Sequence, residues 1–414
     1  MQYKLTAPIG LNTTVKLPAS KSISNRALIM CALSGSKTLP SNLSDCDDTT
    51  VIINALQNNP YTIDILAAGT AMRFMTAYLA VTPGEHELTG TERMKHRPIG
   101  ILVDALRRLG ADIEYVGEEG YPPLRIKGKQ LEGGELSIAG NVSSQYISAL
   151  LMIGPILSKG LSIRLTGDII SRPYIDLTLW MMREFGADAT WTGNDSIRIS
   201  PKPYIQREYT IESDWSAASY WYEMVALNRK PEDEVRLTGL MDGSKQGDSI
   251  VRYIYSLLGV KTIFESTTPN TPSTLKLRNT GRRVPRLEYD FVSAPDLAQT
   301  FVTSCCFMGV HFHFTGLQTL KIKETDRIEA LKTEMRKLGY VLTDIDGREL
   351  LWNGERCDAD YSMGLDTYED HRMALAMAPL AFKADNIVIN NPHVVSKSYP
   401  HYWDDLRAAG FIIQ

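Results

Sequence analysis

The sequence predicts a mixed α/β (α+β) protein of two domains built from a repeated β-α unit. Two observations predict this fold. The chain has 414 residues, 43% of them hydrophobic, which is more than one ordinary hydrophobic core accommodates. One pattern also recurs about six times: a strand-like segment, a junction of small or polar residues, and an apolar helix rich in Ala, Met and Leu.

The junctions mark where each apolar helix is expected to begin. The later ones are spaced by roughly seventy to eighty residues, which is too long for a solenoid and typical of a pseudo-symmetric array of β-α units. In chain order they are Ser20-Lys21-Ser22, Ala68-Gly69-Thr70, Ser143-Ser144-Gln145, Ser213-Asp214-Trp215, Ala294-Pro295-Asp296 and Asp370-His371-Arg372. Helical runs follow them, for example over residues 147–152 and 373–377.

A second helix in most units is expected to end at a glycine that leads into a strand. These glycines are Gly110, Gly186, Gly259 and Gly339. Each unit therefore has the expected order β-α-β-α-β-β. The second unit is the exception, because residues 48–68 have room for one helix and one strand only, and we expect it to be shortened there.

Composition limits the partners and the compartment of the protein. The net charge of −4 gives no general attraction to nucleic acid or membrane, so any anion must be bound by locally gathered Lys and Arg side chains. The N-terminus lacks a signal pattern, and no stretch has the roughly eighteen apolar residues of a membrane span. The five cysteines have neither zinc-type spacing nor an even number. We expect a cytoplasmic protein, with Cys305 and Cys306 in a buried helix.

The segment 17–26 combines a hydroxyl-rich helix start with two cations. A helix that opens at Ser20 to Ser22 leaves its first backbone N–H groups free, and the positive end of its dipole favours an anion. Lys21 lies in that first turn, where a cation opposes the dipole, so a phosphate or carboxylate is expected between them. The alternative is a Ser N-cap with solvated Lys21 and Arg26, and the segment alone does not separate the two.

Further cations lie at other junctions. Lys323 and Arg327 would share one helix face at i and i+4, which is mildly destabilising unless an anion lies between them. Asp296 and Glu324 also lie at junctions, where a helix dipole and nearby cations would hold one of them ionised as a base. Any one cluster taken singly is better explained as a solvated face, but several at equivalent junctions favour anion binding. The clusters cover residues 93–97, 323–327, 370–372 and 396–398.

The sequence lacks the usual cofactor motifs. It has no phosphate-binding loop, no dinucleotide glycine fingerprint and no His-Glu-x-x-His motif. His311 and His313 alternate as in a strand, but a third metal ligand is not apparent. We therefore expect a transfer between anionic substrates that uses no cofactor and no metal.

Seven short motifs cover nearly the whole length of the chain. They are Pro18-Ala19-Ser20-Lys21-Ser22 through Arg26, Ala68-Gly69-Thr70-Ala71-Met72-Arg73, Arg93 to Gly100, Ser143-Ser144-Gln145, Ser171-Arg172-Pro173-Tyr174, Lys323-Glu324-Thr325-Asp326-Arg327 and Asp370-His371-Arg372-Met373-Ala374. In this order they resemble the motifs of the 5-enolpyruvylshikimate-3-phosphate (EPSP) synthase family, also called 3-phosphoshikimate 1-carboxyvinyltransferases.

The resemblance implies both a fold and a reaction. Two pseudo-symmetric domains of three β-α-β-α-β-β units each, inverse α/β barrel-like, would close on the substrates in a cleft between them. One domain would comprise residues 20–212, with its second unit shortened near 48–68, and the other residues 1–19 and 213–414. The 5-hydroxyl of shikimate 3-phosphate would add to phosphoenolpyruvate, and phosphate would leave the tetrahedral intermediate, the sixth step towards chorismate and the aromatic amino acids. A monomer that binds only these small molecules is expected.

Carried over by motif, the resemblance also implies roles for single residues. Shikimate 3-phosphate would be held by Lys21, Ser22, Arg26, Ser143, Ser144, Gln145, Ser171, Tyr174, Asp296 and Lys323. Phosphoenolpyruvate would be held by Lys21, Gly69, Arg97, Gln145, Arg327, Arg372 and Lys397. Asp296 would be the base on the attacking hydroxyl and Glu324 the proton donor to the methylene carbon, with Lys21 also in reach. Forked Arg donors suit carboxylate and phosphate, and a glycine lets backbone N–H groups approach an oxyanion.

Several positions depart from the family pattern. They are Ala67, Phe74, Thr319, Lys321 and Glu369, where Asn, Pro, Asn, Arg and Asn respectively are common. These departures bear on affinity and on the response to glyphosate, which is expected near Gly69 in the phosphoenolpyruvate subsite, more than on the type of reaction.

Two alternatives remain at this stage. The enolpyruvyl transferase that acts on UDP-N-acetylglucosamine has the same fold, but it usually carries Lys-Asn in place of Lys21-Ser22 and a loop cysteine where residues 93–97 have none. The other alternative is a catalytically silent binding protein that kept the fold.

Overall fold

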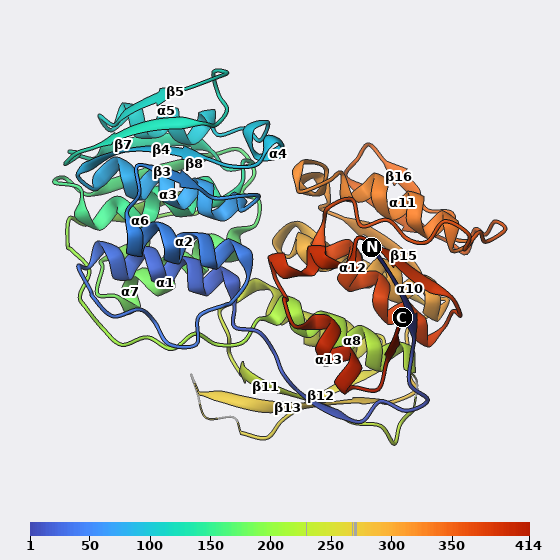
Figure 1. Ribbon diagram of the computed structural model, residues 1–414. Coiled ribbons are helices and arrows are strands. Elements are labelled where there is room, and N and C mark those ends of the chain that lie inside the picture. Colours follow the sequence, from blue (N-terminus) through green and yellow to red (C-terminus); the bar gives the residue numbers. More distant parts are fainter. Residues whose placement is uncertain (229, 267, 269–270) are drawn as a thin grey trace. The chain divides into compact units, whose positions relative to one another are not determined.

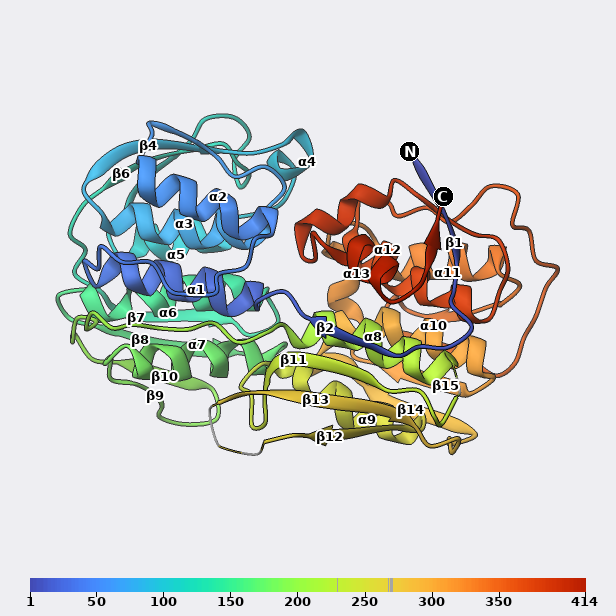
Figure 2. The same cartoon turned by 60° about the horizontal axis from the view of Figure 1, so that its bottom comes forward.

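The computed structural model describes residues 1–228, 230–266, 268 and 271–414, and this chain divides into two compact units (Figure 1 and Figure 2). The continuous unit comprises residues 19–211, and the split unit comprises residues 1–18 and 212–414. Each unit has its own hydrophobic core.

One topology recurs in four of the five described sheets. In residues 134–199 it consists of β7 (Gly134–Ala139), α6 (Ser144–Ile153), β8 (Leu161–Thr166), α7 (Arg172–Glu184), β9 (Ala189–Trp191) and β10 (Ser196–Ile199). The strand order is β7-β8-β10-β9, with β7 parallel to β8 and the other pairs antiparallel. The β-α-β-α-β-β order predicted from the sequence is therefore confirmed.

The continuous unit contains a second complete set and one short set. The complete set is β3 (Thr62–Asp64), α3 (Gly69–Val81), β4 (Gly84–Thr89), α4 (Glu92–Lys95), α5 (Gly100–Arg108), β5 (Asp112–Tyr115) and β6 (Leu124–Gly128). The short set holds α1 (Lys21–Leu33) and α2 (Asp47–Asn58), and its described strand contact is a single parallel bridge between Ser41 and Thr210.

The prediction that the second unit is shortened is therefore wrong. Residues 48–68 do hold one helix and one strand, but that strand, β3, begins a complete sheet with the order β3-β4-β6-β5. In the described chain no strand pair lies between α2 and β3, so the shortened unit is the first one of this domain. The physical reason is that α2 ends in a left-handed turn at Asn59 and the chain enters β3 within a few residues.

In the split unit, the first two strands of the chain complete sheets that are formed mostly by its C-terminal half. The first set is β2 (Thr13–Lys16), α8 (Trp215–Asn228), β11 (Val235–Met241), α9 (Val251–Leu257), β12 (Val260–Phe264) and β13 (Pro272–Asn279), with β2 parallel to β11. The second is β14 (Arg286–Asp290), α10 (Ala298–Met308), β15 (His311–Thr315), α11 (Arg327–Lys337), β16 (Thr343–Ile345) and β17 (Glu349–Trp352). The third is α12 (His371–Met377), β18 (Ile387–Asn390), α13 (Tyr402–Ala408), β19 (Ile412–Ile413) and β1 (Gln2–Thr6), which lies between β18 and β19.

The first helix of each set lies in the core. Figure 1 shows α1, α2, α3 and α6 packed side by side in the continuous unit. Helices α3, α6, α8 and α10 are buried around nearly their whole circumference, as expected for helices that are apolar on every face. Cys305 and Cys306 lie in α10 with at most 1% of their surface exposed, which confirms their predicted burial. The glycines predicted to end the second helices, at 110, 186, 259 and 339, all have positive φ.

The sheets remain separate and open. Among the described residues no sheet closes on itself, so the barrel-like arrangement that the resemblance implied does not extend to a closed barrel. None of the described helices is both long and apolar enough to cross a membrane.

The end of β6 packs directly on the end of α3, and this contact generates a prediction about stability. A Cβ atom at Gly128 would lie 1.8 Å from the carbonyl oxygen of Thr82 and 2.3 Å from that of Leu79. Gly128→Ala is therefore expected to lower the free energy of unfolding by about 3 kcal/mol, because backbone must move to admit the methyl group. Denaturant unfolding measures this change. Gly117→Ala is the matched control, since a Cβ atom at Gly117 would lie 3.9 Å from its nearest neighbour, Cδ of Pro123. Equal stability of the two variants would contradict the prediction.

Candidate active site

In the split unit, the Arg327 guanidinium binds three carboxylates. Its Nε lies 2.7 Å from Asp370 Oδ2, its Nη1 lies 2.9 Å from Asp296 Oδ1, and its Nη2 lies 2.9 Å from Glu324 Oε2. Arg327 is 1% exposed and Asp370 is fully buried. The sequence left open whether Asp296 and Glu324 lie close together. They do, because both bind the buried Arg327 guanidinium.

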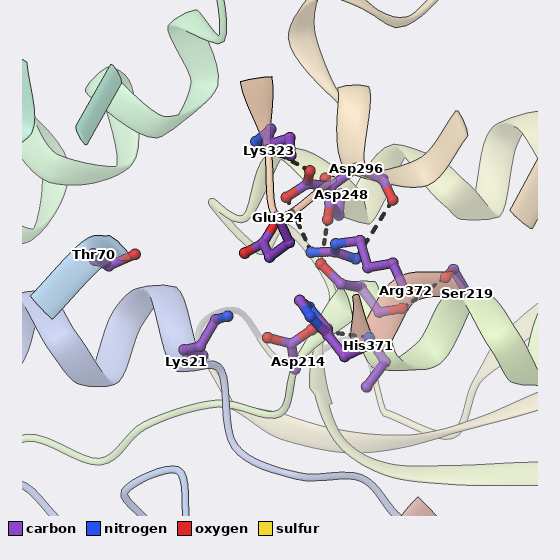
Figure 3. Close-up of polar contacts among 12 residues, drawn as sticks. Lys21, Thr70, Asp214, Ser219, Asp248, Asp296, Lys323, Glu324, His371 and Arg372 are labelled. Atoms are coloured by element: carbon purple, nitrogen blue, oxygen red, sulfur yellow. Dashed lines mark hydrogen bonds and ion pairs between the residues drawn. The ribbon is translucent and has the colours of Figure 1, made fainter. Parts of the chain in front are cut away.

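Asp296 also binds two further cations. Arg372 Nη2 lies 3.0 Å from Asp296 Oδ2, and Lys323 Nζ lies 3.3 Å from Oδ1 (Figure 3). Arg372 comes from the first turn of α12, while Asp296 lies in a short 3-10 helix, Pro295–Leu297, directly before α10. Two junctions that are distant in sequence therefore meet at this carboxylate.

Glu324 has a second cation of its own. Lys397 Nζ donates to Glu324 Oε1 at 2.6 Å, and Lys397 is 8% exposed. The cluster thus contains four cations and three carboxylates, which leaves one positive charge in excess. We call these seven side chains the Arg327 cluster: Asp296, Lys323, Glu324, Arg327, Asp370, Arg372 and Lys397.

The cations keep Asp296 ionised. Burial alone would raise its pKa, but Arg372, Lys323 and Arg327 outweigh burial and hold the pKa of Asp296 well below its usual range. Asp248 behaves differently. It is 3% exposed, it accepts a hydrogen bond from Ser216, and burial raises its pKa to about 6 although Arg372 is near (Figure 3).

One local prediction about this cluster is wrong. Lys323 and Arg327 do not share a helix face, because α11 begins at Arg327 and Lys323 lies before it, at the end of the 3-10 helix Gln318–Ile322. Asp326 stops the helix from starting earlier, since its carboxylate caps the N–H groups of Ile328 and Glu329. An anion does lie between the two cations, as expected, and it is Asp296 of the protein itself.

In the continuous unit, Lys21 is the first residue of α1 and binds a carboxylate. Its Nζ lies 3.3 Å from Asp48 Oδ2, and 17% of its side chain is exposed. Ser20 does not cap the helix with its side chain, and its buried hydroxyl has no partner among the described residues. The alternative of a Ser N-cap beside solvated cations therefore does not hold.

Arg26 is buried among neutral groups. Its guanidinium donates to Thr178 Oγ1 at 2.7 Å and Ser148 Oγ at 3.1 Å, and to the carbonyls of Ser22 and Tyr174 at 2.8 and 3.4 Å. Burial lowers its pKa to about 10, so it stays charged at neutral pH. None of these four acceptors carries a charge, so the positive charge of Arg26 is not balanced by any of them.

Three further predicted site residues, Ser143, Ser144 and Gln145, lie where α6 begins. Gln145 Nε2 donates to Thr70 Oγ1 at 3.1 Å, so the first turns of the two helices are in contact. Ser143 caps α6 by accepting from the Gln145 N–H, and Ser144 is the first residue of that helix. Ser171 precedes α7 with φ +56° and is 9% exposed.

Gly69 and Arg97 are also brought together. A Cβ atom at Gly69 would lie 2.7 Å from Arg97 Nη1, so the guanidinium packs on the bare backbone where α3 begins. The loop that carries Arg97 is fixed at the carbonyl of Pro98, which accepts from Arg73 Nη2 at 2.9 Å and from the Tyr146 hydroxyl at 2.5 Å.

The predicted site residues are therefore divided between the two units. The split unit holds Asp296, Lys323, Glu324, Arg327, Arg372 and Lys397; the continuous unit holds Lys21, Ser22, Arg26, Gly69, Arg97, Ser143, Ser144, Gln145, Ser171 and Tyr174.

Sequence reasoning missed the residues that hold these groups in place. Asp370 was part of a motif, but the only sequence signal for it was an acidic residue at a helix start. Asp48, Thr70 and Arg73 gave no separate signal, because their partners are distant in sequence or are backbone carbonyls.

Two of the departures from the family pattern, Phe74 and Thr319, have buried side-chain atoms. Phe74 is fully buried, and the Arg26 guanidinium lies 5.3 Å from the centre of its ring, a favourable cation–π distance. The Thr319 hydroxyl is buried and has no partner among the described residues.

The family model for EPSP synthase (3-phosphoshikimate 1-carboxyvinyltransferase) matches residues 5–59 and 53–406. A 3-phosphoshikimate 1-carboxyvinyltransferase of Bacteroides fragilis is 59% identical over 414 residues, covering 100% of this chain and 99% of the relative. That of Photobacterium damsela subsp. piscicida is 36% identical over 436 residues, covering 98% and 99%.

Solved structures agree on the fold. An EPSP synthase of Acinetobacter baumannii superposes with a TM-score of 0.80 at 19% identity, covering 100% of this chain and 99% of that one. With the family match over most of its length and relatives well above 30% identity, the chain belongs to the EPSP synthase family.

Proposed function

We propose that this chain is a transferase that moves the enolpyruvyl group of phosphoenolpyruvate to the 5-hydroxyl of shikimate 3-phosphate and releases phosphate. The reaction belongs to the shikimate pathway, which leads to chorismate and the aromatic amino acids. The observation that carries the proposal is the Arg327 cluster, in which two candidate acid–base carboxylates are held among four cations.

The cations suit the charges of phosphoenolpyruvate. Its carboxylate and phosphate are acceptors that suit guanidinium groups such as those of Arg327 and Arg372, while Lys397 adds a point charge. In the continuous unit, Arg97 on Gly69, Gln145 and Lys21 are the proposed further contacts of this substrate.

Shikimate 3-phosphate is proposed to bind Ser22, Arg26, Ser143, Ser144, Gln145, Ser171 and Tyr174 in the continuous unit, together with Lys21, Lys323 and Asp296. Arg26 supports this proposal because its cation is buried among uncharged partners and gains most from an anion. Hydroxyls at the starts of α1, α6 and α7 add donors to the same set.

The proposed chemistry is an addition followed by an elimination. The substrate hydroxyl bonds to the central carbon of phosphoenolpyruvate, its proton passes to Asp296, and Glu324 or Lys21 protonates the methylene carbon. Phosphate then leaves the tetrahedral intermediate as the methyl group returns a proton. The carboxylates stabilise cationic character at the central carbon, and the cations hold the departing phosphate.

The same proposal includes a monomer in the cytoplasm. All candidate contacts of both substrates lie on one chain, and the five cysteines are all unpaired, which fits a reducing compartment.

Phosphate release tests the function directly. Purified protein is given phosphoenolpyruvate with shikimate 3-phosphate, and in parallel with UDP-N-acetylglucosamine. Release is expected only with the first acceptor, and Lys21→Ala is expected to lower it at least about a hundredfold, because a cation at the reacting anion is lost. Lys37→Ala is the control, because Lys37 is exposed and its loss is expected to leave the rate of phosphate release unchanged. Release in neither tube would favour a silent binding protein instead.

The role of Glu324 is tested by solvent exchange. In D₂O, Glu324→Gln is expected to slow deuterium entry into the methylene group of phosphoenolpyruvate by about a hundredfold or more, because the amide cannot deliver the proton. Glu329→Gln is the matched control, because Glu329 is exposed and lies in the first turn of α11, five residues after Glu324. Exchange at the wild-type rate in Glu324→Gln would assign this proton to another group, with Lys21 the next candidate.

The contact between Gly69 and Arg97 predicts a selective effect. In Gly69→Ala the added methyl group displaces the Arg97 guanidinium, so KM for phosphoenolpyruvate is expected to rise about tenfold and the inhibition constant of glyphosate to rise further. Steady-state kinetics measure both constants. Unchanged glyphosate inhibition would show that the inhibitor does not reach this wall of the site.

A further inference from the structure

A strained turn carries Asp370 into the Arg327 cluster. The N–H of Asp370 donates to the Thr367 carbonyl at 2.8 Å, and the two residues between them, Tyr368 and Glu369, have φ of +54° and +55°. A four-residue turn with this bond and two left-handed central residues is of type I′. Such turns favour Asn and Gly, whereas Tyr and Glu both carry a Cβ atom that opposes the left-handed conformation.

Asp370, at the end of this turn, binds both arginines of the cluster. Asp370 accepts from Arg327 Nε at 2.7 Å and Nη2 at 3.2 Å, and it caps α12 by accepting from the Arg372 N–H at 3.0 Å. A shift of the turn would therefore move both guanidiniums that are proposed to bind phosphoenolpyruvate.

A second carboxylate, Glu334 on α11, holds the turn. The Tyr368 hydroxyl donates to Glu334 Oε1 at 2.5 Å, and the Asp366 N–H donates to Oε2 at 3.0 Å. Lys337 Nζ lies 2.9 Å from Glu334 Oε2 and 3.0 Å from Asp366 Oδ2. Glu334 is fully buried, whereas Tyr368 and Glu369 at the tip of the turn are exposed, so the hydroxyl ties the exposed tip of a strained turn to the interior.

Helix α11 thus binds the segment 366–370 at two places. Its first residue, Arg327, binds Asp370, and Glu334, two turns further on, binds Asp366 and Tyr368. The distance between the two attachment points is fixed by the helix. The segment can then adopt only a narrow range of positions relative to the Arg327 guanidinium.

We infer that Glu334 and Tyr368 are positioning residues for phosphoenolpyruvate: through the type I′ turn they set the place of Asp370, and through Asp370 that of Arg327 and Arg372. This inference rests on the proposed function. It extends the site to two residues outside the Arg327 cluster, the buried Glu334 and the exposed Tyr368.

Tyr368→Phe tests the inference with the smallest change, because it removes the hydroxyl and keeps the ring. KM for phosphoenolpyruvate and its dissociation constant by calorimetry, with shikimate 3-phosphate present, are expected to rise about fivefold. This is less than the loss of a hydrogen bond to a charged group would cost directly, because the effect reaches the substrate only through Asp370. The dissociation constant of shikimate 3-phosphate alone is expected to stay within about twofold, since most of its proposed contacts lie in the continuous unit. Tyr361→Phe is the matched control, a partly exposed tyrosine outside the turn.

Rescue separates positioning from general stability. Glu369→Gly removes a Cβ atom from a left-handed position, so the turn needs its tether less, and in the double variant with Tyr368→Phe the affinity for phosphoenolpyruvate is expected to return to within about twofold of wild type. An unchanged affinity in Tyr368→Phe would overturn the inference, as would an equal loss for both substrates that Glu369→Gly fails to rescue. If the wild-type protein showed no turnover, the proposed function would be refuted instead. The calorimetric affinity of Tyr368→Phe for phosphoenolpyruvate, compared with that of the wild type, would still test the positioning role.

Discussion

The buried Arg327 guanidinium is the interaction around which the split unit arranges its chemistry. Its three carboxylate partners come from three different junctions, those before α10, α11 and α12. A buried cation is costly unless it is fully paired, and a cation in the first turn of a helix also opposes the helix dipole. Asp296, Glu324 and Asp370 offset both costs together. None of the three can move independently, because each would leave the guanidinium short of a partner.

The path of the chain is a second constraint. Strand β2 pairs with β11 and β1 with β18 and β19, so the split unit cannot complete two of its sheets without the N-terminal residues. The chain leaves this unit after Pro18, whose carbonyl accepts from the Asp214 N–H at 2.9 Å, where the chain has returned. Lys21 follows only three residues later, at the start of α1. The outgoing and returning segments are therefore tied together immediately before a proposed catalytic residue.

The parts of this architecture that could be predicted are those encoded locally. Repeated junctions, apolar helices and terminal glycines gave the β-α-β-α-β-β order, and the gathered cations pointed to anion binding before any partner was known. What failed depended on contacts distant in sequence or on competing local caps. Asp326 delays the start of α11, so Lys323 and Arg327 are not on one helix face. Ser20 looks like an N-cap, yet its hydroxyl makes no cap bond, and the partner of Lys21 is Asp48 on another helix. The shortened unit was assigned to the second set of the continuous unit instead of the first. A strand pair that is absent has no sequence pattern of its own, so its position could not be recognised from the sequence.

The pairing within the Arg327 cluster has a consequence for catalysis that follows from electrostatics alone. Asp296 is ionised because Arg372, Lys323 and Arg327 surround it, and a carboxylate with so low a pKa is a poor proton acceptor. Phosphoenolpyruvate would bring its own carboxylate and phosphate to the same cations and compensate their charge. The pKa of Asp296 would then rise towards the value that burial alone favours, and its basicity would rise with it. Substrate binding would in this way make Asp296 a better acceptor in the role proposed for it, while without substrate the cations of the cluster stay paired with its carboxylates.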